Sequence, residues 1–305
     1  MQLPHDWASL IKDWERALKA ENKSDRTIGI YTTAARDFGL WVNREDDIAP
    51  DEAGTHEVRD FVAHLIERTS PGNANTNYRA LQQWFKFLII EDEIETSPMV
   101  NMKPPYVPEK PVPIVPDDLL KRVLETCKGK DFQSRRDTAL VRIFFDTGAR
   151  LSEIANLTLD DIDFNVDAVR VVGKGSKERV VPFSPNTGTA LSRYLRARKS
   201  HKLSEHERVW LGIKNRGPMT PNGIGQMLRR RGREVGVEAE MGRHLHAHLG
   251  RHAASHHWQA NGGSESDLML VMGWTSPQMP KRYGKSAAVE RAHASARKLR
   301  LGDRF

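Results

Sequence analysis

The chain has 305 residues, of which 38% are hydrophobic, and a formal net charge of +7. This apolar share excludes a wholly disordered chain, and the length exceeds that of one ordinary compact domain, so we expect two domains. Residues 1–105 hold 12 Lys and Arg against 18 Asp and Glu, whereas residues 106–305 hold 35 against 22. A polyanion such as nucleic acid is therefore expected to bind mainly to the second part.

The single cysteine, Cys127, excludes a disulfide framework within one chain, which suits a reducing compartment. The N-terminus shows no basic segment followed by an apolar run, and the run Phe87-Leu88-Ile89-Ile90 is far too short to span a bilayer. We therefore expect a soluble, cytoplasmic protein without a membrane partner.

The first hundred residues show helical periodicity. Apolar side chains recur at spacings of three and four in four segments, which run from Trp7 to Leu18, Ile30 to Trp41, Val58 to Leu65 and Leu81 to Leu88. This pattern predicts four amphipathic helices. Ser24-Asp25 is a candidate cap for the second helix, and Pro71-Gly72-Asn73 separates the third helix from the fourth.

Six of the 16 prolines fall within residues 104–116. Proline lacks a backbone donor and restricts the residue before it to extended conformations, so this segment is expected to be a stiff linker. The charge changes sign at the same place. We therefore predict a helical domain over residues 1–103, a linker over 104–116 and a second domain over 117–305.

The second domain is predicted to be mainly α with a small antiparallel β-sheet, an α+β fold. Pro116-Asp117-Asp118 begins a helix, and Thr138 to Phe145 forms a mostly apolar one. Val169 to Val172 and Val180 to Phe183 have the shorter period of strands and flank a polar turn.

Two basic features lie around these elements. Gly148 suits a tight turn before a helix, on which Arg150 and Glu153 can share a face. Such a pair is also common as a simple surface salt bridge. In the turn Gly173-Lys174-Gly175-Ser176-Lys177, a lysine can approach a phosphate, although a solvated hairpin has the same composition.

Six of the 12 histidines lie between His244 and His257, around Arg251. One interpretation is a metal site, because imidazoles one helical turn apart can share an ion. A phosphate site is the other, because His248 and Arg251 are also one turn apart and a guanidinium fits phosphate oxygens. No cysteine or HExxH motif accompanies the cluster, which disfavours a metal.

Pro277 and Pro280 interrupt regular structure just before Tyr283. Proline is tolerated in the first turn of a helix, so Pro280 suits the start of a short one. We expect Tyr283 to be exposed and movable there, although a tyrosine taken alone more often simply packs in a core.

Taken together, these segments resemble the tyrosine recombinase (phage integrase) family. TGARLSEIANLTLDDID (147–163) is similar to its first arginine box, GKGSKERVVP (173–182) to its lysine hairpin, and HLGRHAASHHWQANG (248–262) to its His-x-x-Arg-His box. MGW (272–274) precedes Tyr283 at the usual distance of the nucleophile. In the first domain, Thr27 to Trp41, Arg79 to Leu88 and Ser97 to Pro105 look like the family's helical core-binding domain.

The sequence departs from the common pattern at three positions of the second domain. Trp274 stands where most relatives have histidine, Gly250 stands where leucine is usual, and Pro280 is an unusual residue so near the nucleophile. The first domain is also more acidic than a DNA-clasping domain is expected to be.

The resemblance implies a catalytic set, with Tyr283 as the nucleophile of a 3′-phosphotyrosyl intermediate and no metal or nucleotide cofactor. Arg150 and Arg251 would hold the phosphate, Lys174 would be the general acid with Lys177 as second choice, His248 would assist proton transfer, and Trp274 would hold a phosphate oxygen or support Tyr283. Glu153 would orient a basic neighbour. Further DNA contacts are predicted at Lys177, Arg179, Arg229, Arg230, Arg231 and Arg233, although charge runs are often simply solvated.

The resemblance also implies the partners, which are a double-stranded core site with inverted half-sites, a homotetramer on two duplexes and a possible directionality factor. The tail Ser286–Phe305 would dock on a neighbouring subunit or pack on its own domain. We expect an integrase of a phage or other mobile element. The alternatives are a Xer-like chromosome or plasmid resolvase, a topoisomerase-like nicking and closing enzyme, and a catalytically silent DNA-binding regulator.

Overall fold

The computed structural model describes residues 2–44, 47–108, 113–173, 175–214 and 216–299, without the side chains of residues 285–287, 289–291 and 294–295. The chain divides into two compact units, residues 1–110 and 111–305. The division falls within the proline-rich segment that we predict to be a linker.

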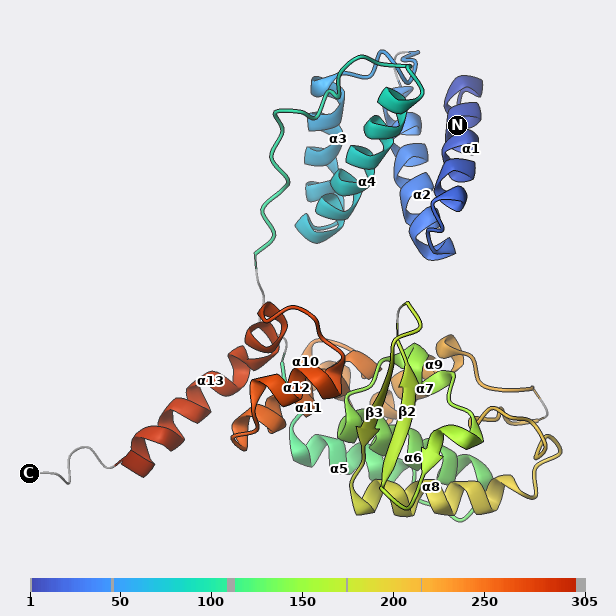
Figure 1. Cartoon of the computed structure of the whole chain (residues 1–305), viewed down its shortest axis with the longest axis vertical. Coiled ribbons are helices and arrows are strands. Elements are labelled where there is room, and N and C mark those ends of the chain that lie inside the picture. The colour runs from blue at the N-terminus through green and yellow to red at the C-terminus, as the bar shows by residue number, and fades with distance from the viewer. Residues whose placement is uncertain (1, 45–46, 109–112, 174, 215, 300–305) are drawn as a thin grey trace, which may run out of the picture. The chain divides into compact units, whose positions relative to one another are not determined.

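The first unit confirms the four predicted helices, which are α1 (His5–Ala20), α2 (Asp25–Val42), α3 (Thr55–Arg68) and α4 (Pro71–Ile90) (Figure 1). The Ser24 hydroxyl caps α2 by accepting the Thr27 N–H, as its position before the helix predicts. Pro71 is the first residue of α4, where its missing N–H costs no hydrogen bond.

An aromatic core holds these four helices together. The Trp7 and Trp84 rings stack with centroids 5.9 Å apart, and Phe38 meets Trp7 edge-on at 5.7 Å. All three side chains are fully buried. Burial of such large rings dominates the stability of a small helical unit.

The second unit has a helical body with one small sheet. Its helices are α5 (Asp117–Thr126), α6 (Phe132–Thr147), α7 (Leu151–Ala155), the 3₁₀ turn η1 (Leu159–Asp161), α8 (Pro185–Arg198), α9 (Pro221–Glu234), α10 (Val237–Met241), α11 (Ala247–Ala260), α12 (Glu265–Met272) and α13 (Gln278–Leu299). Strands β1 (Ile162–Asp163), β2 (Ala168–Val172) and β3 (Glu178–Pro182) pair antiparallel in the order β1-β2-β3. The predicted fold class is confirmed, and β1 is a third strand that sequence periodicity did not predict.

The core of the second unit is centred on α6, which packs against both α8 and α11. Gly148 ends α6 with a left-handed φ of 61°, which is the tight turn predicted before α7. The chain then turns directly into Arg150, so a helix at the centre of the core places this residue.

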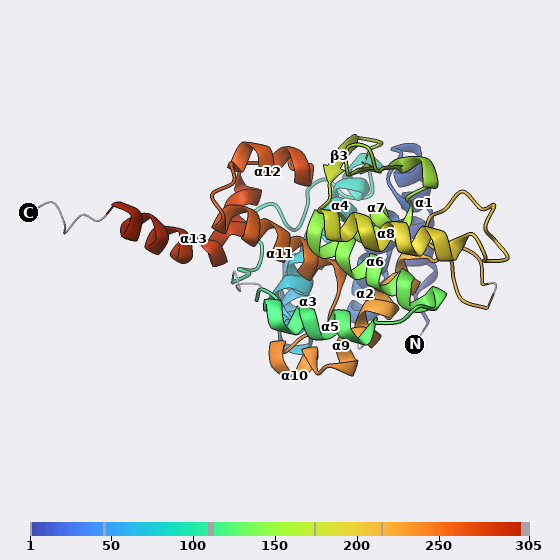
Figure 2. The same ribbon diagram turned by 90° about the horizontal axis from the view of Figure 1, so that it is seen from below.

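Helix α13 is longer than the short helix predicted after Pro277. It runs to Leu299, and Figures 1 and 2 both show its C-terminal half extending away from α11 and α12. The docking predicted for residues 286–305 stays a prediction, because residues 300–305 lie outside the described part of the chain. No helix in the described ranges combines the length and apolar character needed to cross a bilayer.

Candidate active site

A buried glutamate connects the start of α7 to the sheet. Glu153 accepts hydrogen bonds from the Arg150 backbone and side chain, both at 2.7 Å, and from both terminal nitrogens of Arg179, at 2.7 and 2.8 Å. Burial alone would raise the pKa of Glu153, but the bonds from Arg179 and Arg150 outweigh it and hold the pKa at about 2. This carboxylate is therefore ionised at neutral pH and fixes both arginines.

Arg251, on α11, is the most deeply buried cation of the site, with 3% of its surface exposed. Its guanidinium donates to the Gly148 carbonyl at 2.9 Å and to the Met272 carbonyl at 2.6 Å, and lies 5.0 Å from the Trp274 ring centroid. Burial, followed by the positive charge of Arg150, lowers the pKa of Arg251 to about 10. The Arg251 charge thus remains at neutral pH, close to a second guanidinium.

Tyr283 is buried, which corrects the expectation of an exposed and movable side chain. Only 5% of its surface is exposed. Its ring stacks on His252 with centroids 4.2 Å apart and lies 4.7 Å from Trp274. The two prolines did not loosen this segment, because α13 packs along α11 and brings the tyrosine against that helix.

The Tyr283 hydroxyl lies 3.2 Å from Nε2 of His248. Burial raises the pKa of Tyr283, against the opposing pull of Arg251 and Arg282, so the phenol is protonated at neutral pH. Partial burial and the charges of His246, Arg251 and Arg282 lower the pKa of His248. A neutral imidazole therefore faces a protonated phenol, which is an arrangement suited to proton transfer.

The root of the predicted lysine hairpin adjoins this site. Lys174 itself lies outside the described residues, and Lys177 is exposed. A Cβ at Gly173 would lie 3.5 Å from the Glu153 carboxylate and 3.7 Å from an Arg179 nitrogen. The residue before Lys174 therefore lies beside the Arg150–Glu153–Arg179 cluster.

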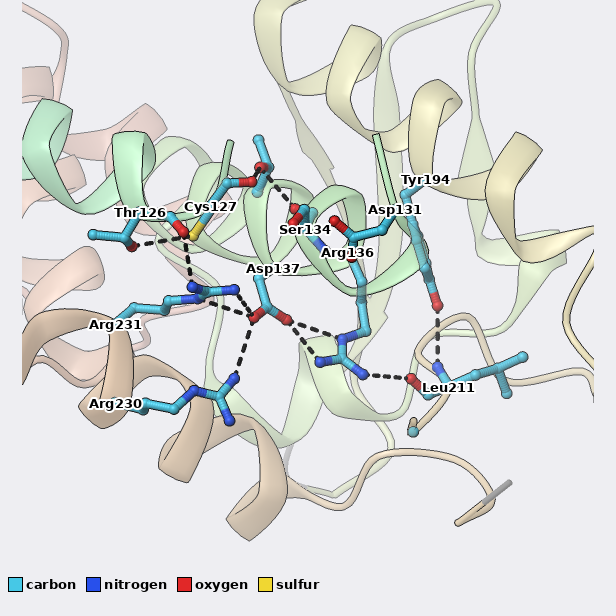
Figure 3. Close-up of polar contacts among 12 residues, drawn as sticks. Thr126, Cys127, Asp131, Ser134, Arg136, Asp137, Tyr194, Leu211, Arg230 and Arg231 are labelled. Carbon is cyan, nitrogen blue, oxygen red and sulfur yellow. Dashed lines mark hydrogen bonds and ion pairs between the residues drawn. The ribbon is translucent and has the colours of Figure 1, made fainter. Parts of the chain in front are cut away.

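The predicted DNA contacts in the arginine run of α9 lie in different surroundings. Arg231 is buried and donates to Asp137 at 2.8 and 3.1 Å, whereas half-exposed Arg230 reaches the same carboxylate at 3.3 Å (Figure 3). Arg229 and Arg233 are exposed. Asp137 also binds Arg136, which places three guanidinium groups around one carboxylate.

Three residues of the site were not singled out by sequence reasoning. His252 stacks on Tyr283, and burial with the nearby charges of His248 and Arg282 lowers its pKa to about 3. Gln259 donates to the Pro280 carbonyl at 3.1 Å and so ties α11 to the first turn of α13. The positive charge of Arg282 acts to lower the pKa of His248 and His252 and opposes the rise in the pKa of Tyr283. The signal for His252 was its spacing of one helical turn from His248.

The metal interpretation of the histidine cluster finds no support in the described part of the chain, where no group of three or more His, Cys, Asp or Glu side chains is placed to hold an ion. His248 and His252 instead contact each other and Tyr283 through their rings.

Each of the two units matches a known protein family or domain. The phage integrase family matches residues 114–290, and the N-terminal SAM-like domain of phage integrases matches residues 10–95. The chain is 32% identical to tyrosine recombinase XerC of Actinobacillus pleuropneumoniae over 60% of its length and 58% of that protein. It is 27% identical to tyrosine recombinase XerA of Thermococcus kodakarensis over 96% of its length and 95% of that protein.

A solved structure shares this fold. A lambda integrase dimer bound to a core site aligns with a TM-score of 0.73 at 13% identity, and the alignment covers 92% of this chain and 96% of the other. The family match extends over more than half of the chain, so the chain belongs to the phage integrase family of tyrosine recombinases. It is a site-specific recombinase whose catalytic domain cuts and rejoins DNA.

Proposed function

We propose that the scissile phosphate binds between Arg150 and Arg251 and that Tyr283 attacks it to form a 3′-phosphotyrosyl bond. The observation that supports this proposal most strongly is the burial of the Arg251 charge. This cation is almost fully buried and has no carboxylate partner among the described residues. Buried charge without a counter-charge is costly, and Arg150 adds a like charge beside it. An anionic phosphate relieves both, and more so as charge develops in the transition state.

The proton of Tyr283 leaves towards His248. Its neutral imidazole, with the proton on Nδ1, offers Nε2 as the acceptor 3.2 Å from the hydroxyl. The phenolate oxygen then bonds to phosphorus, and the bond from phosphorus to the 5′-oxygen breaks. Trp274 and His252 both contact the Tyr283 ring and hold it in place.

The leaving 5′-oxygen takes its proton from Lys174, with Lys177 as the second choice. Support comes from the position of Gly173 beside the Glu153 carboxylate. Arg179 was predicted to contact DNA, but its guanidinium already binds Glu153 and the Val271 carbonyl. We therefore assign Arg179 a positioning role, which holds the hairpin and Arg150 in register.

The biological reaction that we propose is recombination at a core site with inverted half-sites, by four copies of the chain on two duplexes. Similarity to XerA along nearly the whole chain supports a Xer-like resolvase. The fold shared with lambda integrase supports the second candidate, an integrase of a phage or mobile element. A plasmid that carries two copies of the site distinguishes the two candidate functions, because a resolvase deletes the segment between the copies without an added directionality factor.

The experiment begins with the Tyr283→Phe variant, which is used to select a bound site from fragmented host DNA. A duplex with this site and a nick beside the scissile phosphate then traps the covalent adduct, which is read on a denaturing gel. Wild type and the matched control Tyr106→Phe, whose ring is 84% exposed, are expected to form the adduct, and Tyr283→Phe is expected to form none. Binding without an adduct by wild type, or an adduct by Tyr283→Phe, contradicts the proposal.

A further inference from the structure

The second unit also contains a basic pocket. Its volume is about 560 Å³, and it is lined by the loop after α5 and by faces of α6 and α8. Figure 2 shows α5, α6 and α8 side by side on the side of the unit turned to the viewer. None of the described residues of the proposed catalytic set lines this pocket.

The walls of the pocket carry cations on both sides. Arg135 and Arg142 come from one face of α6, and Arg193 comes from the facing side of α8. Lys128 and Lys130 lie on the loop, and the single acidic residue of the lining, Glu125, pairs with Lys128. In the described ranges, the other four cations have no carboxylate partner.

Two of these arginines are partly buried, which makes their isolation informative. Arg135 and Arg142 are both shielded from water in part, and the one polar contact described for Arg135 is a 3.4 Å bond to the Arg193 carbonyl. Like charges that line one partly desolvated pocket repel one another. The buried arginines of the second unit bind Asp137, Glu153 or carbonyl groups, whereas no polar contact is described for the side chain of Arg142.

The remaining lining suits a ligand with both charged and apolar parts. The side chains of Thr189 and Asn186, in the first turns of α8, can hydrogen-bond to anionic oxygens, whereas Leu124, Cys127 and Ala190 form an apolar wall. The volume is in the usual range for small-molecule sites, roughly 300–1,000 Å³, and is far too small for a duplex. Guanidinium groups present a planar fork that matches phosphate oxygens.

We propose that this pocket binds a small phosphate-rich molecule, a nucleoside polyphosphate or an inorganic polyphosphate of similar length. The phosphates would lie between Arg142 on α6 and Arg193 on α8, with Lys130 and Arg135 at the edge. A nucleoside would place its base against Leu124 and Ala190. Helix α6 ends at Gly148, two residues before Arg150. A ligand bound to α6 would therefore contact the helix that places this arginine.

The test is isothermal titration calorimetry of the full chain with inorganic triphosphate and, separately, with ATP, both without DNA. One saturable site per chain is expected for triphosphate. The double variant Arg142→Ala/Arg193→Ala is expected to bind at least about tenfold more weakly, since one charge-assisted hydrogen bond is worth that factor. Neither side chain makes a described polar contact, so the variant is expected to fold.

The matched control is Lys121→Ala/Lys199→Ala, which also removes two positive charges. These lysines lie at exposed positions outside this pocket, on α5 and at the end of α8. It is expected to bind triphosphate within about twofold of wild type. Tighter binding of ATP than of triphosphate identifies a nucleotide ligand, and equal binding identifies the phosphate chain alone. Both results support the pocket.

Three outcomes overturn the proposal. Absence of saturable binding removes the site, and equal weakening in both double variants shows only general electrostatic attraction. If Arg142→Ala/Arg193→Ala instead loses affinity for duplex DNA and wild type does not bind triphosphate, these arginines are part of the DNA surface.

Discussion

The two units of the chain bury different kinds of side chain. The first unit is held by aromatic rings, with Trp7, Trp84 and Phe38 in mutual contact. In the described residues, all buried ionisable Arg, Asp, Glu and His side chains belong to the second unit, and they are Arg136, Asp137, Glu153, Arg198, Arg231, Arg251, His252 and His256. In the first unit, the buried indole N–H groups of Trp41 and Trp84 find no hydrogen-bond partner among the described residues.

This difference shows that the free-energy cost of desolvating charge falls on the second unit. Burial of an ion costs several kcal/mol unless geometry and hydrogen bonds compensate. In the first unit, apolar and aromatic packing fixes the shape. In the proposed function, the second unit holds guanidinium groups at set positions before a phosphate arrives, and preorganised charge of this kind lowers the barrier to phosphoryl transfer.

The largest effect is expected for Arg251→Met compared with Arg198→Met. Cleavage of the nicked substrate is expected to fall by about 10²–10³ or more in Arg251→Met, as for other preorganised donors. Arg198 is equally buried but donates to the carbonyls of Val209, Ser204, His206 and Arg208, away from the site. Its loss removes the donor to the Ser204, His206 and Arg208 carbonyls, whereas Val209 keeps the bond from Tyr194. Arg198→Met is therefore expected to lower stability and leave cleavage by the folded chain intact.

Urea unfolding and single-turnover cleavage check this pair. The expected result is a crossed pattern, in which each variant changes mainly one of the two quantities. If both variants lose stability and cleavage in proportion, the buried charges of the second unit serve packing alone, and the contrast between the units loses its functional meaning.

The sequence predicted those parts of the molecule that depend on local pattern. Four helices of the first unit followed from periodicity, and the cap at Ser24 followed from residue type. Strand β1 escaped because two residues carry no period. The arginine run on α9 could not be divided from sequence, because Arg231 is turned inward by Asp137, which lies 94 positions earlier.

The site shows the same limit. Family motifs named Tyr283 and its partners, but the burial of this tyrosine depends on the packing of α13 against α11, which no local pattern encodes. The unusual Gly250 has a tertiary reason as well, because a side chain there would meet the backbone of α6. What sequence missed was set by contacts between segments that are far apart in the chain.

An intermediate effect is expected for Glu153→Gln, with a defined pH dependence. The pKa of Glu153 is held at about 2 against an ordinary value of 4.5. Because the folded pKa is depressed, the stabilisation is fully present above pH 4.5 and is lost as the pH falls towards 2. Its size is on the order of 3 kcal/mol. The stability difference between wild type and Glu153→Gln is therefore expected to be large at pH 7 and to shrink below pH 4.5.

The matched control comes from the first unit. Glu57 is also the third residue of its helix, α3. Its carboxylate accepts the N–H of Gly54, the residue that precedes the helix, at 2.9 Å. It has no arginine partner, so Glu57→Gln is expected to change stability by less than about 1 kcal/mol. Urea unfolding between pH 3 and 7 measures both variants. A pH-independent deficit in Glu153→Gln would contradict the proposed ion-pair origin.

The smallest effect is expected for two glycines at close helix contacts, one in each unit. A Cβ at Gly39 would lie 2.7 Å from the Trp7 ring, and a Cβ at Gly250 would lie 2.7 Å from the Phe144 carbonyl oxygen. Overpacking costs about 1–3 kcal/mol, of which the better helix propensity of alanine returns up to about 1 kcal/mol. Gly39→Ala and Gly250→Ala are therefore both expected to lower the unfolding midpoint modestly.

At temperatures below the unfolding midpoints of both variants, only Gly250→Ala is expected to slow cleavage. The backbone of α6 cannot yield as a side chain can, so α11 must move away and carry Arg251 with it. The bond from Arg251 to the Gly148 carbonyl, at 2.9 Å, joins these two helices and is then stretched. Cleavage rates of the two variants, measured at one temperature where both are folded, decide the matter. Equal slowing in both would show that general loosening, rather than the position of Arg251, limits the reaction.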